Sequence, residues 1–126
     1  MHGVHTTTDP DVIAGYLTDA SNTSGHADCL ALPRNTEQVA AVVKHCQENQ
    51  IPLTVTAQRT STTGGPVPHG GWLLSMEGLD EVYGPDDVGA GVILGEHQDE
   101  LERAGKLFPP DPTSRYECTV GAAIAC

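Results

Sequence analysis

The sequence is poor in aromatic residues and in positive charge. Its 126 residues include three Tyr, one Trp and one Phe, and Leu, Ile, Val and Phe together number 26. A chain of this length predicts one small domain, and so few apolar residues predict a thin core. Six Lys and Arg face 17 Asp and Glu, which gives a net charge of -11 at pH 7. Because nucleic acids and anionic membrane surfaces require a basic face, we expect neither as a partner.

Long apolar runs and closely spaced cysteines are also missing. The longest apolar runs have only a few residues, whereas a membrane-spanning helix needs about 20. The first residues lack the charged and apolar regions of a secretory signal. The four cysteines are widely spaced without a C-x-x-C pair, which argues against a disulfide framework or a zinc site. We therefore expect a reducing, cytoplasmic setting, no membrane insertion and no metal.

Familiar catalytic and nucleotide-binding motifs are incomplete. Residues 89–95 (GAGVILG) approach the dinucleotide motif G-x-G-x-x-G but carry Leu94 where the third glycine belongs. Gly64 and Gly65 are not followed by the Lys-Ser/Thr of a phosphate-binding P-loop, and His97 lacks the second histidine of a zinc-protease motif. No G-x-S-x-G segment marks a hydrolase. We place no catalytic residue in this chain, and a nicotinamide-dependent enzyme is a minor alternative.

Apolar spacing predicts three helices. The clearest covers residues 36–49, where apolar residues recur at i, i+3, i+4 and i+7 along one face and Asn35 can cap the start. Residues 9–20 carry one apolar face of a shorter helix. Residues 95–104 form a third, with Gly105 placed to end it.

Short apolar or β-branched runs predict strands at residues 29–32, 53–56 and 72–76. Helix 36–49 lies between the first two, so the order strand, helix, strand predicts a parallel βαβ unit. Residues 77–88 are acidic and rich in turn residues. We therefore expect an α+β fold in which a small mixed or parallel sheet contains this unit and is flanked by helices.

The loop that follows strand 53–56 is the strongest local sign of a binding site. Residues 57–71 hold four glycines and two prolines among small polar residues. Successive main-chain N–H groups in such a turn can bind an anion, and Arg59 adds a charged donor. The residues alone support two interpretations equally, a cradle for a phosphorylated ligand or a polar surface loop. The candidate ligand residues are Thr56, Ala57, Gln58, Arg59, Thr60, Ser61, Thr62, Thr63, Gly64 and Gly65.

Several segments, in order, match one family of flavoproteins. They are residues 16–21 (YLTDAS), 32–43 (LPRNTEQVAAVV), 51–53 (IPL), 63–68 (TGGPVP), 108–114 (FPPDPTS) and 119–125 (TVGAAIA). Together they resemble the FAD-binding domain of the vanillyl-alcohol oxidase (PCMH-type) superfamily. The greatest similarity is to the branch that contains the FAD-binding subunit of glycolate oxidase and D-lactate dehydrogenases.

The resemblance implies which residues bind the cofactor. In this family the glycine-rich loop wraps the FAD pyrophosphate with main-chain amides, which implicates residues 57–65 together with Val67 and Pro68. A second segment lies along the pyrophosphate and the flavin, and its counterparts here are Pro110, Asp111, Pro112, Thr119, Gly121, Ala122 and Ala125. No histidine matches a position of covalent attachment, so the resemblance implies noncovalent FAD.

The chain also departs from the family pattern. Ala57, Arg59 and Ser61 replace glycines that are common in the pyrophosphate loop. Arg59 could donate to a phosphate, whereas Ala57 and Ser61 would strain the loop if their positions require a positive φ. Ala122 and Ala123 replace a glycine and an asparagine.

From the resemblance we expect residues 1–126 to be a partial FAD-binding domain, the N-terminal subdomain, with a second half-domain and a substrate domain absent. The parent would be an FAD-linked oxidoreductase of a small 2-hydroxy acid like glycolate or D-lactate, and the fragment would have no turnover of its own. The alternative is a non-catalytic interaction module that kept the fold and lost the flavin. Its apolar residues 120–126 could then form a homodimer interface.

Overall fold

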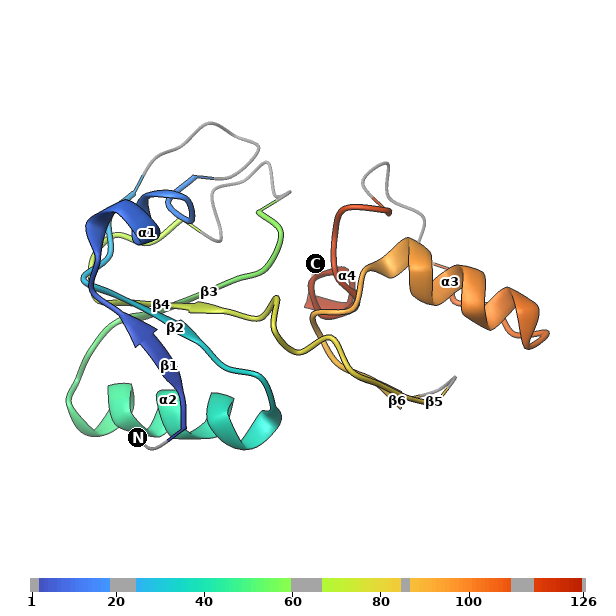
Figure 1. Ribbon diagram of the computed structural model, residues 1–126, viewed down its shortest axis with the longest axis horizontal. Helices are drawn as coiled ribbons and strands as arrows, with labels where there is room; N and C mark the ends of the chain where they lie inside the picture. Colours follow the sequence, from blue (N-terminus) through green and yellow to red (C-terminus); the bar gives the residue numbers. More distant parts are fainter. Residues whose placement is uncertain (1–2, 19–24, 60–66, 85–86, 110–114, 126) are drawn as a thin grey trace.

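The computed structural model describes residues 3–18, 25–59, 67–84, 87–109 and 115–125. Figure 1 shows two adjacent parts. The first is a four-stranded sheet with a helix on each face, and the second holds a two-stranded hairpin and two helices. The α+β class and the small mixed sheet agree with the sequence-based prediction.

The sheet contains strands β1 (His5–Thr7), β2 (Cys29–Leu32), β3 (Leu53–Thr56) and β4 (Trp72–Ser75). Their spatial order is β1-β2-β4-β3. Strands β2, β4 and β3 run parallel, and β1 pairs antiparallel with β2. The three predicted strands are therefore confirmed.

The predicted βαβ unit is present with one addition. Helix α2 (Thr36–Glu48) connects β2 to β3, and the two strands point the same way. They do not pair with each other, because β4 lies between them: Leu73 is opposite Leu30 on one side and Thr54 on the other. No sequence pattern predicts this insertion, since β4 comes later in the chain.

Helix α2 begins at a capping arrangement. The Asn35 side chain accepts a hydrogen bond from the Gln38 main-chain N–H at 2.8 Å. The Gln38 side chain accepts from the Arg34 N–H at 2.7 Å and donates to the Gly3 carbonyl at 2.8 Å. The predicted cap therefore forms, and the same glutamine also ties the start of the chain to the helix.

Helix α1 (Pro10–Ala14) is shorter than the predicted 9–20. It ends at Gly15, whose N–H bonds Val12 in a tighter i to i+3 turn. The apolar face survives beyond the helix, because Tyr16 and Leu17 still pack beside Ile13 against the sheet. Periodicity thus located three of the four predicted face residues correctly, whereas Val12 is exposed, and the glycine set the end of the helix.

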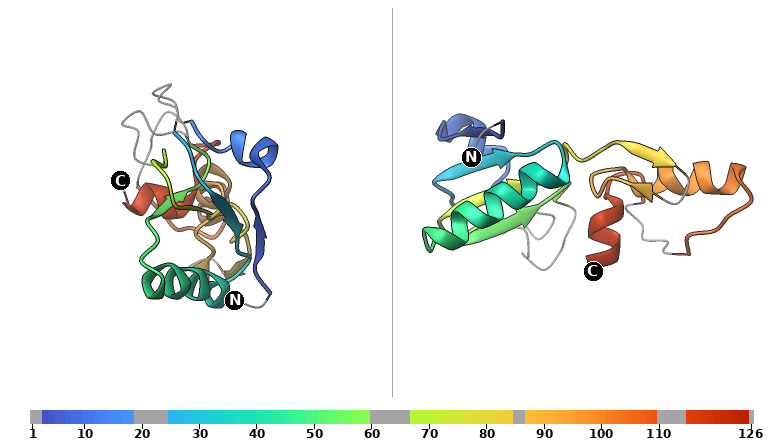
Figure 2. Two further views of the ribbon diagram at one scale, coloured as in Figure 1. Left: turned by 90° about the vertical axis from the view of Figure 1, so that its left-hand side faces the viewer. Right: turned by 90° about the horizontal axis from the view of Figure 1, so that it is seen from below.

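Helices α1 and α2 lie on opposite faces of the sheet (Figures 1 and 2), and an apolar layer lies beneath each of them. Beneath α2, Ala31 and Leu74 of the sheet pack against Val42 and Cys46 of the helix. On the α1 face, Leu30 and Leu73 pack with Ile13. Neighbouring residues of each strand alternate between these layers, as a sheet buried on both faces requires.

The second part follows β4. Strands β5 (Val82–Gly84) and β6 (Asp87–Val88) form an antiparallel hairpin within the acidic, turn-rich segment. Helices α3 (Leu94–Arg103) and α4 (Val120–Ala125) pack around a small core of Val92, Leu94, Cys118 and Val120. The sequence did not predict the hairpin, whose residues Val82 and Tyr83 are exposed.

The predicted helix over residues 95–104 is confirmed as α3, and Gly105 ends it. Gly105 has φ of 75°, its N–H bonds the Glu102 carbonyl at 3.0 Å, and the Lys106 N–H bonds the Leu101 carbonyl at 2.8 Å. This pair of bonds is the Schellman arrangement, in which a glycine adopts the left-handed conformation. In the described part of the chain, no helix combines the length and apolar character needed to cross a membrane.

Candidate functional site

The predicted loop leaves the sheet at the carboxyl ends of parallel strands. Strand β3 ends at Thr56 and β4 ends at Ser75, which lie opposite each other in register. The Thr56 carbonyl accepts the Met76 N–H at 2.8 Å, so the two strand ends are joined. Ligands of open α/β sheets bind beyond the carboxyl ends of strands, because loops there converge.

The Thr56 side chain is buried at the base of this loop. The residue is 2% exposed, and its Oγ1 has no hydrogen-bond partner within the described residues. Buried hydroxyls nearly always have a partner, and an orphan costs about 1–3 kcal/mol. A ligand that brings phosphate or ribityl oxygens to this edge would satisfy the orphan, so the residue fits a bound dinucleotide.

Arg59 is held by protein groups. Its guanidinium lies 2.9 Å from Glu77 Oε1 and 3.2 Å from the Ala57 carbonyl oxygen, and it sits 4.8 Å from the centre of the Tyr16 ring. The Arg59 and Glu77 side chains are 24% and 27% exposed. Both hydrogen bonds come from Nη1 of Arg59. Donation from Arg59 to a phosphate stays a prediction.

The backbone strain expected in the loop lies at Arg59. Within the described residues, the non-glycine positions with positive φ are Gln50 at 54° and Arg59 at 58°. Ala57 therefore has an ordinary negative φ, and its substitution for glycine strains nothing. Ser61 lies outside the described residues. A left-handed conformation at a non-glycine residue costs about 1 kcal/mol, so the Arg59 side-chain contacts help to hold it.

The loop returns to the sheet through two buried predicted residues. Val67 is 3% exposed, and Pro68 is also fully buried. The Pro68 carbonyl accepts the His26 N–H at 2.9 Å, and the Gly70 N–H bonds the His26 carbonyl at 2.7 Å. Val67 and Pro68 therefore anchor the returning end of the loop beside the segment that leads into β2.

The second predicted segment is described around α4. Thr119 is 1% exposed, pairs with Ile93 in a short antiparallel bridge, and accepts the Ala122 N–H on its Oγ1 at 3.3 Å. The Gly121 N–H bonds the Ala90 carbonyl at 2.9 Å. Thr119 and Gly121 thus fix the start of α4, while Ala122 is half-buried and Ala125 is exposed.

The remaining predicted residues cannot be placed. Thr60, Ser61, Thr62, Thr63, Gly64, Gly65, Pro110, Asp111 and Pro112 lie outside the described residues. Figure 1 shows α4 on the side of the second part nearest the sheet, so α4 and the end of β3 face the same region of the molecule.

Two residues at this site were not predicted from the sequence. Glu77 lies two residues past the end of β4, the strand that neighbours β3, so its position at the shared strand edge could have suggested contact with the loop. Tyr16 follows α1, more than 40 positions before Arg59 in the printed sequence, and no local pattern links the two.

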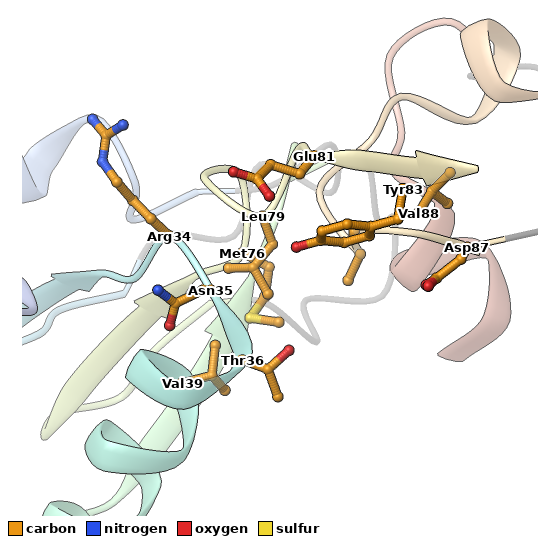
Figure 3. Close-up of a pocket in the computed structure, with 12 residues that line it drawn as sticks. Arg34, Asn35, Thr36, Val39, Met76, Leu79, Glu81, Tyr83, Asp87 and Val88 are labelled. Atoms are coloured by element: carbon orange, nitrogen blue, oxygen red, sulfur yellow. The ribbon is translucent and has the colours of Figure 1, made fainter.

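A separate cavity of about 280 Å³ lies between the start of α2, the end of β4 and the β5–β6 hairpin (Figure 3). Its wall is apolar at Val39, Met76 and Leu79, and polar at Glu81 and Tyr83. None of the predicted site residues lines it. Within the described residues no group of three or more His, Cys, Asp or Glu could hold a metal ion.

Similarity to known proteins identifies the family of this chain. The sequence pattern of a family described as "FAD binding domain" matches residues 27–126. The chain is 39% identical over 105 residues to D-lactate dehydrogenase of Anaerostipes hadrus, covering 78% of this chain and 22% of that protein. It is 29% identical over 104 residues to the glycolate oxidase subunit GlcD of Bacillus subtilis, covering 77% of this chain and 22% of that protein.

The fold agrees as well. The solved structure of alkyldihydroxyacetonephosphate synthase superimposes with a TM-score of 0.81 at 16% identity, covering 95% of this chain and 26% of that chain. The chain thus spans only about a quarter of the length of the proteins it matches. Its sequence pattern, its strand order and the loop at the strand ends together show that the chain belongs to the FAD binding domain family of PCMH-type, FAD-linked oxidases.

Proposed function

We propose that this chain is the N-terminal, FAD-binding part of an oxidoreductase that oxidises a small 2-hydroxy acid. The observation that carries the proposal is the orphan Thr56 hydroxyl, buried at the base of a loop that matches the family's pyrophosphate loop. D-Lactate and glycolate, named in the two relatives, are both 2-hydroxy acids. This common chemistry supports the substrate class.

The main-chain amides of residues 57–65 would hold the pyrophosphate, with Thr56, Val67 and Pro68 fixing the ends of the loop. Thr119, Gly121, Ala122 and Ala125, with Pro110, Asp111 and Pro112, would line the flavin side. We propose noncovalent attachment, because no histidine stands at a matching position.

When bound, FAD supplies the redox chemistry by accepting the hydride removed from the α-carbon of the substrate. The part of this chain is to bind and orient the cofactor, and we place no acid–base residue within it. Oxidation of the 2-hydroxy acid is therefore proposed for a complete protein, of which this chain would supply about a quarter.

A binding titration tests the proposal directly. Adding the 126-residue chain to FAD should quench flavin fluorescence with saturation, whereas NAD should not compete. Anaerobic addition of D-lactate or glycolate should leave the flavin of this chain oxidised. Failure to bind FAD would contradict the cofactor role, and rapid bleaching by substrate would contradict the absence of a catalytic base.

The alternative, an interaction module that lost the flavin, is favoured by one observation. Ile124 on α4 is 71% exposed and Leu107 is 85% exposed, so apolar side chains remain open on the second part. Deletion of residues 120–126 would test this interface, but it would also remove Val120 from the core. Ile124→Asn is a cleaner test: dissociation of a dimer in sedimentation, with no FAD binding by the parent chain, would favour the module.

We also propose a cytoplasmic setting. Cys29, Cys46 and Cys118 are free and buried in the described residues, and unpaired cysteines are typical of reducing compartments. Fractionation of cells that express the natural protein would test this location.

A further inference from the structure

We propose that Glu77 and Tyr16 are positioning residues for the start of the predicted pyrophosphate loop, residues 57–59. They act on it through Arg59. The inference rests on the proposed FAD-binding role and assigns two residues that no sequence motif marks. It also changes the role expected for Arg59, from a phosphate donor to the point at which the loop is fastened.

Three segments that are distant in sequence meet at the Arg59 side chain. Tyr16 follows α1, Arg59 lies three residues past the end of β3, and Glu77 lies two residues past the end of β4. The guanidinium donates to Glu77 Oε1 at 2.9 Å and lies 4.8 Å from the centre of the Tyr16 ring. Tyr16 is itself packed beside Ile13 on the α1 face of the sheet. The loop is therefore tied to two parts of the rigid core.

The backbone conformation of Arg59 explains why its side-chain contacts matter. Arg59 has φ of 58°, a conformation that glycine adopts freely and that other residues rarely adopt. A glycine here would leave the loop many conformations to lose when the ligand binds. An arginine held by a carboxylate and a ring keeps residue 59 in the left-handed conformation before a ligand binds, which favours binding by preorganisation.

The charges of Arg59 and Glu77 also favour a positioning role for Glu77. Glu77 neutralises Arg59, and both side chains are about three-quarters buried, at 24% and 27% exposed. Both hydrogen bonds of the guanidinium come from Nη1, and the neighbouring carboxylate offsets the positive charge that would attract a phosphate. The two roles of Arg59 therefore make opposite predictions for Glu77: removing its charge weakens FAD binding if Glu77 positions the loop, and strengthens it if Glu77 competes with the phosphate.

The experiment measures the Kd for FAD of single variants of the 126-residue chain. Glu77→Gln and Tyr16→Leu should each weaken binding by roughly three- to tenfold. Tyr16→Phe keeps the ring and should retain most of the affinity. Glu102→Gln, an equal change of charge on the exposed side of α3, is the matched control and should not alter binding.

A double-mutant cycle tests whether the effect passes through Arg59. Arg59→Gly should bind FAD more tightly than Arg59→Ala, because glycine adopts the required φ without strain. In the Arg59→Gly background, Glu77→Gln should cause no further loss. The proposal is overturned if Glu77→Gln tightens binding or leaves it unchanged, or if it still weakens binding when Arg59 is absent.

A second readout needs no FAD. Trypsin cleaves after arginine, and a guanidinium engaged by Glu77 and Tyr16 resists capture by the protease. Glu77→Gln should raise the rate of cleavage at Arg59 several-fold relative to Glu102→Gln. If the parent chain binds no FAD but this difference appears, the proposed function fails and the fastening of the loop stands. Equal cleavage rates would overturn the fastening itself.

Discussion

Thr56 and Ser75 lie opposite each other at the ends of two neighbouring parallel strands, and both side chains are buried. The Glu77 N–H donates to Ser75 Oγ at 3.4 Å, whereas Thr56 Oγ1 has no partner in the described part of the chain. One hydroxyl of the pair thus serves the fold, and the other is buried without a partner in the described residues.

Replacing Thr56 by valine separates these two roles. Valine has nearly the same shape and removes the unpaired hydroxyl, so the free energy of unfolding without ligand should rise by about 1 kcal/mol or stay equal. The affinity for FAD should fall. Urea unfolding and a flavin titration on the same variant check the two signs, and a fall in stability would show that the hydroxyl already has a partner.

Gly105 should not tolerate alanine. Its φ of 75° would strain any side chain, although a Cβ there meets no atom within 4 Å. Gly105→Ala should lower the free energy of unfolding by about 1 kcal/mol. Gly15→Ala is the control, because its φ of -68° is ordinary and its Cβ would lie 3.6 Å from the Val12 carbonyl oxygen. Equal losses for both would contradict the backbone explanation.

Gly121 should also resist substitution, for a steric reason. A Cβ on Gly121 would lie 2.7 Å from the Ala90 Cβ. Gly121→Ala should cost about 1 to 3 kcal/mol of stability by overpacking. Ala90→Gly removes the opposing methyl group, so the double variant should recover part of that loss. Thermal unfolding of the four proteins checks the pairing, and a simple sum of the two losses would argue against direct contact.

The thiols of Cys29 and Cys46 make the free energy of unfolding depend on pH in the alkaline range. Burial raises the pKa of Cys29, with a further contribution from neighbouring Cys46, and burial also raises the pKa of Cys46. A thiol with a raised pKa in the folded protein holds its proton more tightly there than in the unfolded chain. Its contribution to stability is complete below the ordinary thiol pKa of about 8.5 and is lost as pH rises above it.

The measurement is the urea midpoint followed from neutral pH into the alkaline range. The midpoint of the natural chain should fall more steeply than that of a Cys29→Ala, Cys46→Ala variant, which lacks both thiols. Parallel curves would assign the alkaline loss to other groups.

The sequence predicted the elements whose signals are local. The stripe of Val39, Val42, Val43 and Cys46 located α2, although Val43 is exposed, and Gly105 located the end of α3. It did not predict the hairpin, because β5 and β6 are only three and two residues long and largely exposed, so they carry no alternation. It also gave no sign that β4 would enter between β2 and β3, since pairing of distant strands leaves no local trace.

The candidate site likewise combines features that the sequence predicted with contacts that it did not predict. Small residues and a preceding strand marked the loop, and its position at the strand ends follows from the parallel sheet. The contacts of Arg59 were not predictable, because Tyr16 and Glu77 approach it through the fold rather than through the sequence. The positive φ fell on Arg59 rather than on Ala57, a choice that only the course of the backbone decides.

The place of β4 between β2 and β3 sets the order in which the sheet can be assembled during synthesis. Strand β3 pairs with β4 among the described strands, and β4 is made last of the four. Until Trp72–Ser75 has left the ribosome, β3 has no neighbour and Leu73 cannot close the apolar layer over Leu30. The loop after β3 is therefore already synthesised before the two strand ends that flank it, at Thr56 and Ser75, can meet.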